Sequence, residues 1–165
     1  MSNLARTYAE PSLFEFNDIS QHSSNFNSNL ATLSQRKECF LHALKGDTLK
    51  YKRYTKSPLR YGGGKSLAVG LIIEHFPNDI SRIISPFIGG GSVEVASALE
   101  LNLEVKAFDI FDILVNFWQL VSTKSQKLYD ELCQLEPNKE TYAWIKDELK
   151  KHYKNEAKLD KLTLA

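Results

Sequence analysis

The sequence predicts an α/β protein whose core is the opening of a doubly wound parallel sheet. Two observations support this prediction. A short apolar run at 82–84 leads into the glycine-rich turn SPFIGGGS, which is followed by a segment with helical spacing. A second such run, at 104–108, ends at Asp109, and another helical segment begins soon after it. Strand, glycine turn, helix, strand, acidic residue and helix, in this order, are typical of a nucleotide-type cofactor pocket.

The composition indicates one globular domain. Of the 165 residues, 42% are hydrophobic and 25% charged, and the net charge of +1 indicates no class of partner. Seven lysines and arginines between 45 and 65 oppose Asp47 alone, a pattern compatible with a phosphate-facing surface and with a solvated stretch. Two cysteines without metal-ligand spacing, and no signal-type or membrane-spanning run, favour a reduced cytoplasmic interior. The four isolated histidines predict no metal site.

Three segments follow from pattern and composition. Residues 1–56 are expected to form an N-terminal extension, 57–123 the cofactor-binding part of the domain, and 124–165 a helical segment. Within the extension, 17–29 is rich in serine and asparagine without a period, which predicts a loop or a partly disordered arm. Residues 35–44 predict a short helix.

The next elements surround the glycine turn. A helix is predicted over 66–76 because apolar residues recur there at helical spacing, with a face made of Leu67, Leu71, Ile72 and Phe76. The run at 82–84 stops at Pro86 and suits a buried parallel strand. Ser92 is expected to cap a helix that runs to about 101, because its hydroxyl can accept a backbone N–H of the first turn.

The later elements are mostly helical. Residues 104–108 predict a second strand, and Asp112 is expected to start a helix whose face consists of Ile113, Phe117, Leu120 and Val121. A further helix is marked by Leu128, Leu132 and Leu135. A longer amphipathic helix is predicted from Asn138 to about Asn155. The C-terminal stretch 159–165 has the pattern of a helix interior, without a stop signal.

The turn at 89–91 and Asp109 form the first candidate site. A turn without side chains lets a ligand approach the backbone, and the helix that follows presents free N–H groups and a positive dipole end. Asp109 ends the next strand, where a carboxylate can accept both ribose hydroxyls of an adenosine-type ligand. The plainer interpretation, a tight turn and a helix-capping aspartate, stays open.

Two better-known nucleotide-binding patterns are incomplete here. The pattern G-x-G-x-x-G needs a glycine where this chain has Glu94, a poor neighbour for a pyrophosphate. GGGKS resembles the end of a P-loop, but the first glycine of that pattern falls on Leu59, and 50–57 is no buried strand. Next to these glycines, Tyr61 could face an adenine or a sulfonium and Lys65 could pair with an anion, or both could simply complete a turn.

Three motifs together resemble the opening motifs of the Dam-type adenine-specific DNA methyltransferases. They are PLRYGGGK at 58–65, SPFIGGGS at 85–92 and AFDIFDILVNFW at 107–118. That family has a P-x-[KR]-[WY]-x-G-G-K turn, then an E-P-F-x-G-x-G turn, then a strand end of D-I-N-x-x-L-I-N type. The resemblance covers roughly residues 57–162, and ETYAWIKDELK is similar to the family's Y-x-x-[RK] helix.

This resemblance implies a Rossmann-like, S-adenosylmethionine-dependent methyltransferase fold. It implies methyl transfer from S-adenosylmethionine to the amino group of an adenine in DNA, after the base has been flipped out of the duplex. The expected cofactor contacts, carried over by motif position, are Tyr61, Lys65, Pro86, Phe87, Gly89, Gly91 and, at the ribose, Asp109.

The chain departs from the family pattern in two places. Ser85 stands where the family has an acidic residue that would meet the ammonium group of the cofactor, so either binding is weaker or another residue supplies the charge. The sequence also has no D-P-P-[YFW] tetrapeptide, the motif that holds the flipped adenine in the family. We therefore expect an incomplete fold without a catalytic residue, truncated in the target-recognition region, inactive alone and associated with DNA and with a second chain that carries the catalytic half. The alternatives are a non-catalytic module that binds S-adenosylmethionine or a nucleotide, and a P-loop-like hydrolase.

Overall fold

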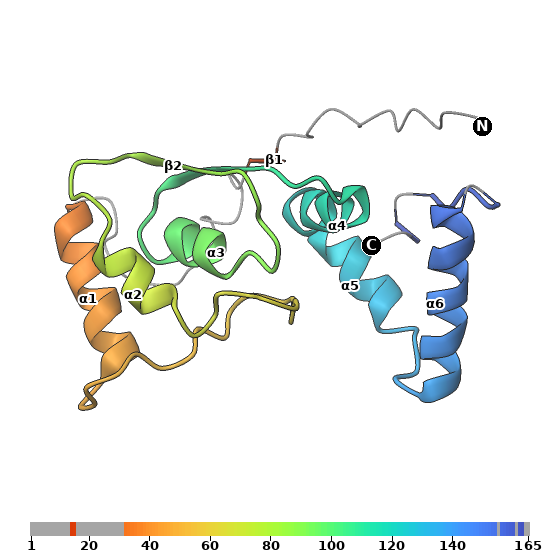
Figure 1. The fold of residues 1–165 in the computed structure, drawn as a ribbon, viewed down its shortest axis with the longest axis horizontal. Coiled ribbons are helices and arrows are strands. Elements are labelled where there is room, and N and C mark those ends of the chain that lie inside the picture. Colours follow the sequence, from red (N-terminus) through yellow and green to blue (C-terminus); the bar gives the residue numbers. More distant parts are fainter. Residues whose placement is uncertain (1–13, 16–31, 155, 161, 164–165) are drawn as a thin grey trace, which may run out of the picture. The chain divides into compact units, whose positions relative to one another are not determined.

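The structure is a computed structural model that describes residues 14–15, 32–154, 156–160 and 162–163 (Figure 1). The chain divides into two compact units, Met1–Ile110 and Phe111–Ala165, and each is described by itself. The segment 17–29, for which a loop or arm is predicted, lies outside the described residues.

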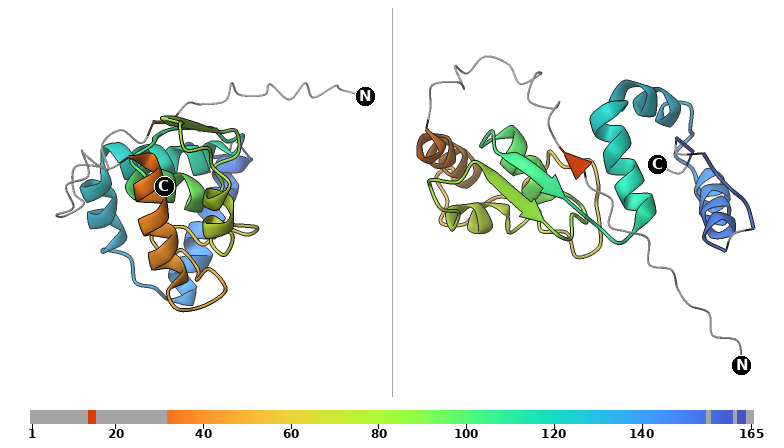
Figure 2. Two further views of the ribbon diagram at one scale, coloured as in Figure 1. Left: turned by 90° about the vertical axis from the view of Figure 1, so that its left-hand side faces the viewer. Right: turned by 90° about the horizontal axis from the view of Figure 1, so that it is seen from above.

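A small three-stranded sheet, in the order β1-β3-β2, is the centre of the first unit (Figure 2). Strands β2 (Arg82–Ser85) and β3 (Glu104–Ala107) run parallel, with Ile83 opposite Val105, which confirms the two predicted strands. Strand β1 (Phe14–Glu15) pairs antiparallel with the other edge of β3. Within the described residues, β3 is therefore the central strand and β2 an edge strand.

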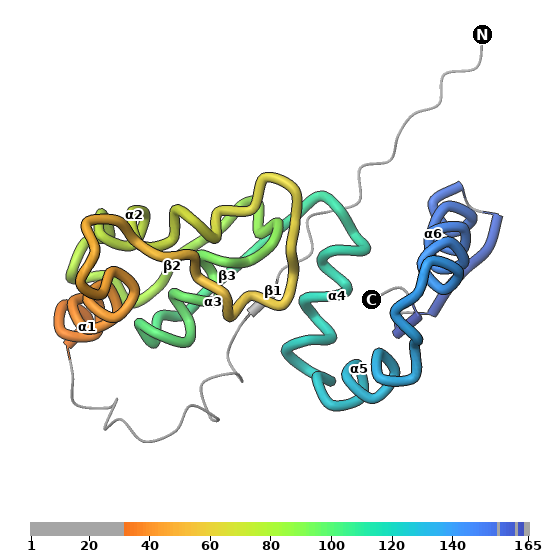
Figure 3. Tube along the Cα trace, turned by 90° about the horizontal axis from the view of Figure 1, so that it is seen from below, coloured from red at the N-terminus to blue at the C-terminus, as the bar shows by residue number. Residues whose placement is uncertain are grey.

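Three helices belong to this unit: α1 (Leu33–Lys45), α2 (Val69–Glu74) and α3 (Ser92–Leu99). The predicted helix in the N-terminal extension is confirmed as α1, which lies beside α2 (Figure 3). A capping box starts it: the Gln35 N–H donates to the Thr32 hydroxyl, and the Thr32 N–H donates to the Gln35 side chain. The fully buried core of the unit lies on α2, α3, β3 and the loop before β3 and consists of Val69, Ile73, Ala96, Leu101, Val105 and Ala107.

Tyr54 anchors the irregular segment that leads to the first glycine turn. Its side chain is buried, its ring packs edge-to-face on Phe40, and its hydroxyl donates to Glu100 at 3.1 Å. Glu100 also pairs with Lys56 at 2.7 Å, and the Tyr54 N–H donates to the Ser66 carbonyl at 2.8 Å. Burial, followed by the neighbouring Glu100 carboxylate, raises the pKa of Tyr54 well above its usual value, so the hydroxyl keeps the proton that it donates.

The predicted apolar face of α2 is wrong. Leu67 and Leu71 are 62% and 55% exposed, whereas Val69, Gly70 and Ile73 are buried. The helix is only six residues long, so a spacing counted from Leu67 does not describe it. Its inward face is set by tertiary packing, because the bare backbone of Gly70 lies against the Tyr51 ring.

Gly70→Ala is expected to lower the free energy of unfolding by about 1–3 kcal/mol, the usual cost of overpacking a filled position. A Cβ at Gly70 would lie 2.4 Å from Tyr51 Cγ, an atom too close to the backbone to swing aside. Urea unfolding measures the change. Gly62→Ala is the matched control, because a Cβ there meets nothing within 4 Å and should cost less than ~0.5 kcal/mol. Equal stability of the two variants would contradict the close packing of Gly70 against the Tyr51 ring.

Two further expectations near the turn are corrected. Strand β2 is not buried on both faces, because Ile84 is 67% exposed and Ile83 only half-buried. Ser92 does not cap α3: the residue before the helix is Gly91, in the left-handed region, and Ser92 is the first helical residue, itself buried. A glycine there frees the turn from side chains, so the helix start has no side-chain cap.

The second unit consists of the predicted helices α4 (Asp112–Thr123), α5 (Ser125–Leu132) and α6 (Lys139–Tyr153). Helix α6 starts at Asn138, whose side chain accepts the Thr141 N–H at 2.7 Å. None of the helices in the described ranges is long and apolar enough to cross a membrane.

Three details of the second unit differ from the prediction. Of the four residues expected to form the buried face of α4, only Leu120 is buried. The other buried apolar side chains of this helix are Leu114, Val115 and Trp118. The helix is apolar on most sides, so spacing alone does not single out its buried stripe. On α5 only Leu128 is buried. Residues 159–160 and 162–163 are not helical, because Asp160 accepts the backbone N–H groups of Leu162 and Thr163 and so closes a turn.

Candidate functional site

The second glycine turn joins β2 to α3 at the carboxyl end of the sheet, as predicted. Gly89 and Gly91 have φ angles of 49° and 64°, a left-handed conformation that glycine adopts without strain. Because Gly91 directly precedes α3, the first N–H groups of that helix emerge at the turn. The Ile88 N–H donates to the Phe108 carbonyl at 2.8 Å, which ties the turn to the end of β3.

Asp109 lies against this turn. Its Oδ2 accepts the Gly89 N–H at 3.0 Å, and the side chain is half-buried. The Phe108 N–H donates to the Ser85 carbonyl at 2.8 Å, so the ends of the two parallel strands are held together. A carboxylate can accept several hydrogen bonds at once, so the same group can position the turn and receive ligand hydroxyls.

The first glycine turn packs on the second. A Cβ added at Gly90 would lie 3.0 Å from Tyr61 Cβ, and one added at Gly89 would lie 3.7 Å from the Tyr61 ring. The Ser57 hydroxyl donates to the Gly90 carbonyl at 2.5 Å and fixes this approach. Tyr61 itself is 45% exposed, so it is neither a core residue nor fully solvated. The absence of side chains at 89 and 90 is what allows the two motifs to touch.

A hollow of about 440 Å³ lies at the first turn. Its lining includes Tyr61, the three glycines at 62–64 and Ser92 at the start of α3, but not Asp109. Lys65 closes its own turn, because its ammonium group donates to the Gly63 carbonyl at 2.8 Å.

The structure thus brings some of the predicted residues together and leaves others apart. Tyr61, Gly89 and Asp109 form one surface. Pro86 and Phe87 are exposed on the loop just before the glycines, and Phe87 is 77% exposed. The Lys65 side chain bonds back to the first glycine turn, at the Gly63 carbonyl.

Ser85 and Glu94 form a pair that the sequence analysis missed. The Ser85 hydroxyl, at the end of β2, donates to Glu94 Oε1 at 2.5 Å. Glu94 is the third residue of α3 and is buried. Burial raises the pKa of Glu94, and the bonds from Ser85 and from the first backbone N–H groups of the helix lower it only in part. The sequence shows only an acidic residue in the first turn of a predicted helix; that Ser85 is its partner follows from the fold.

Glu94→Gln is expected to stabilise the protein increasingly as the pH rises above 4.5, the ordinary carboxyl pKa. A raised pKa means that the folded state holds its proton more tightly than the unfolded state, so the wild type loses stability as the pH rises through this range. An amide has no such titration. Melting temperatures of both proteins between about pH 4 and about pH 8 measure the effect. A difference between the two proteins that stays constant with pH would contradict it.

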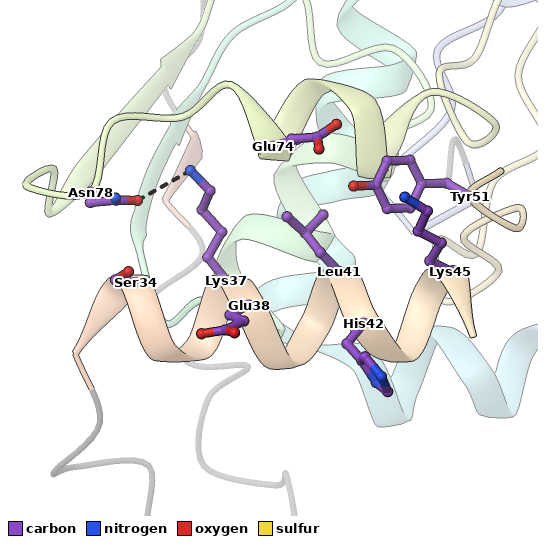
Figure 4. Close-up of a pocket in the computed structure, with 9 residues that line it drawn as sticks. All are labelled: Ser34, Lys37, Glu38, Leu41, His42, Lys45, Tyr51, Glu74 and Asn78. Carbon is purple, nitrogen blue, oxygen red and sulfur yellow. Dashed lines mark hydrogen bonds between the residues drawn. The ribbon is translucent and has the colours of Figure 1, made fainter. Parts of the chain in front are cut away.

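A second hollow, of about 420 Å³, lies between α1 and α2 (Figure 4). None of the predicted site residues lines it. Across it, the Lys37 ammonium donates to Asn78 Oδ1 at 3.1 Å, and the Lys45 ammonium lies 5.5 Å from the centre of the Tyr51 ring. These contacts join α1 to the segments before and after α2, so we regard the hollow as a packing seam of the N-terminal segment.

Comparison with known families identifies the chain. The family model of the D12 class N6 adenine-specific DNA methyltransferases matches residues 61–165, which is more than half of the sequence. The match begins at Tyr61 and includes the second glycine turn and Asp109. Comparison with curated proteins and with solved structures found no match. The match confirms the resemblance to Dam-type enzymes, and the chain belongs to the D12 class of adenine-specific DNA methyltransferases.

Proposed function

We propose that this chain binds S-adenosylmethionine at its two glycine turns, as the cofactor-holding part of an enzyme that methylates the amino group of adenine in DNA. The observation that carries the proposal is the bond between Asp109 Oδ2 and the Gly89 N–H, beside Tyr61. It joins the expected ribose carboxylate to a turn open to a ligand. Two parallel strands with a glycine turn between the first strand and a helix also support a Rossmann-like methyltransferase fold, with 57–123 as the cofactor part.

The residues present suit this ligand. The turn at 89–91 offers bare backbone and the start of α3, and Asp109 offers acceptors for the two ribose hydroxyls. Tyr61 presents an aromatic ring suited to an adenine or a sulfonium. Lys65 would exchange its bond to Gly63 for one to the ligand. When bound, S-adenosylmethionine supplies an electrophilic methyl group; the part of these residues is to bind and orient it.

Chemical-shift changes in amide NMR spectra distinguish ligand binding at this site from binding elsewhere on the chain. On titration with S-adenosylhomocysteine, the resonances of Gly89, Gly91 and Asp109 are expected to shift, together with that of Tyr61. Resonances of α1, in the same unit but not in the lining of the hollow at the first turn, should remain unchanged. Shifts confined to the seam between α1 and α2, at Lys37 and its neighbours, would contradict the assignment.

We propose further that the open edge of β2 receives a strand from a second chain that carries the catalytic half. On the side of β2 that faces β3, the Glu104 N–H donates to the Ser81 carbonyl and the Phe108 N–H donates to the Ser85 carbonyl. The backbone N–H and C=O groups of the residues that alternate with these on β2 therefore point away from β3, toward the open edge. Among the described residues no strand pairs with that edge. Two large apolar side chains, Ile84 on β2 and Phe87 just after it, are more than 60% exposed. An open edge beside apolar surface is a site of association.

Ile84→Lys is expected to reduce concentration-dependent association of the purified chain without lowering its melting temperature. A charge on an edge strand opposes pairing with another strand, and Ile84 is already 67% exposed. Light scattering across a concentration series gives the measurement. Leu49→Lys is the control, because Leu49 is 95% exposed outside the sheet and should leave association unchanged. If both variants behave alike, the edge is not the association surface.

A further inference from the structure

Glu94 is the one buried charged side chain in the described ranges of the chain, with 7% of its surface exposed. Its partners are hydrogen-bond donors: the Ser85 hydroxyl at 2.5 Å and the backbone at the start of α3. It forms no ion pair with any residue that the structure describes. Within the described residues, this buried carboxyl group therefore has no cation beside it.

Stability alone does not account for this carboxylate. A buried charge without a counter-charge costs free energy, and a glutamine would accept the Ser85 bond at a lower cost. The burial that raises the pKa of Glu94 reflects the same cost. The position at the start of α3 offsets part of this cost, because the helix dipole favours an anion there. The dipole does not explain why the residue is an acid rather than an amide.

The position of Ser85 and Glu94 indicates where a cation that pairs with this carboxylate would come from. Ser85 is the last residue of β2 and Glu94 lies in the first turn of α3, so their bond closes the loop that contains the glycine turn at 89–91. The carboxylate is buried next to the two ends of that loop. Another acidic side chain at the turn, that of Asp109 just after β3, accepts the Gly89 N–H. A ligand seated on the glycines would thus have a negative charge at each end of the turn.

We propose, resting on the proposed function, that Glu94 is the counter-charge for the ammonium group of S-adenosylmethionine and that Ser85 orients its carboxylate. The charge that is unpaired in the protein is then paired in the complex. Ligands that have the adenosine part but lack the amino-acid ammonium lose this interaction, so Glu94 sets the selectivity of the site for amino-acid-bearing nucleosides.

The test compares two ligands by titration calorimetry on the whole 165-residue chain. S-adenosylhomocysteine carries the ammonium group, and 5′-methylthioadenosine shares the adenosine and thioether but lacks the amino acid. Glu94→Gln is expected to weaken binding of S-adenosylhomocysteine by about tenfold or more and to change that of methylthioadenosine by less than about twofold. Ser85→Ala should produce a smaller loss in the same direction. Glu140→Gln, in the exposed first turn of α6, is the matched control and should change neither affinity.

The outcomes separate three cases. An equal loss for both ligands in Glu94→Gln means that Glu94 only supports the turn, and no loss means that it has no part in binding; either overturns the inference. A melting temperature at neutral pH no lower than that of the wild type shows that the variant is folded. If the wild type binds neither ligand, the proposed function itself fails, and this inference fails with it.

Discussion

Asp109→Asn is expected to weaken binding of S-adenosylmethionine by about 10- to 100-fold. Hydrogen bonds to a charged group contribute about 1.5–3 kcal/mol, and each 1.4 kcal/mol is a factor of about ten. The carboxylate accepts the Gly89 N–H at 3.0 Å and, in the proposed complex, the ribose hydroxyls. An asparagine presents one carbonyl oxygen and an NH₂ group, so it cannot accept all of these bonds. Calorimetric titration of the two proteins measures the change.

Asp112→Asn is the matched control for this prediction. Asp112 lies three residues further along the chain and is exposed, and its side chain accepts the N–H of the next residue, Ile113. Its replacement should leave the affinity within about twofold of the wild type, well inside the effect of one lost bond. Unchanged binding by Asp109→Asn, in a protein that still melts cooperatively, would show that Asp109 does not hold the ribose.

The purified 165-residue chain is expected to transfer no methyl group to DNA, although it is expected to bind the cofactor. The sequence has no D-P-P-[YFW] tetrapeptide to hold a flipped adenine. Placing the amino nitrogen in line with the methyl group is the main contribution of such an enzyme, and positioning of this kind is worth about 7–11 kcal/mol. Without it the rate falls below detection. Incorporation of labelled methyl groups into adenine-rich DNA, beside an intact Dam-type enzyme as positive control, tests this.

The formation of N6-methyladenine by this chain alone would contradict the prediction. It would mean that some of its own residues hold the adenine in place of the missing motif. Methyl transfer that appears only when a second protein is added agrees with the proposed docking of a catalytic half on the edge of β2.

Local signals in the sequence were sufficient for the elements around the site. Pro86 ends β2, the glycines force the turn, and Asp109 follows β3, so strand, turn, helix and strand were predicted in the right order. The meeting of Asp109 and Gly89 could also be foreseen, because the carboxyl ends of neighbouring parallel strands lie together.

Features that depend on tertiary contacts were not predictable in the same way. The inward face of α2 is decided by the Tyr51 ring against Gly70, and no spacing rule contains that contact. Glu94 was noticed only as a residue that breaks the dinucleotide pattern; its bond to Ser85 requires the fold that brings the end of β2 to the start of α3. The packing of Tyr61 on Gly90 likewise joins segments that the sequence keeps apart.

Titration calorimetry of the wild-type chain with S-adenosylmethionine, and in parallel with ATP and Mg²⁺, tests the central claim most directly. We predict saturable binding of S-adenosylmethionine with a stoichiometry of about one, as expected for a single preformed pocket, and no binding of ATP. Binding of ATP and Mg²⁺ without binding of S-adenosylmethionine would contradict the account. The GGGKS turn, rather than Asp109 and Gly89, would then hold the ligand.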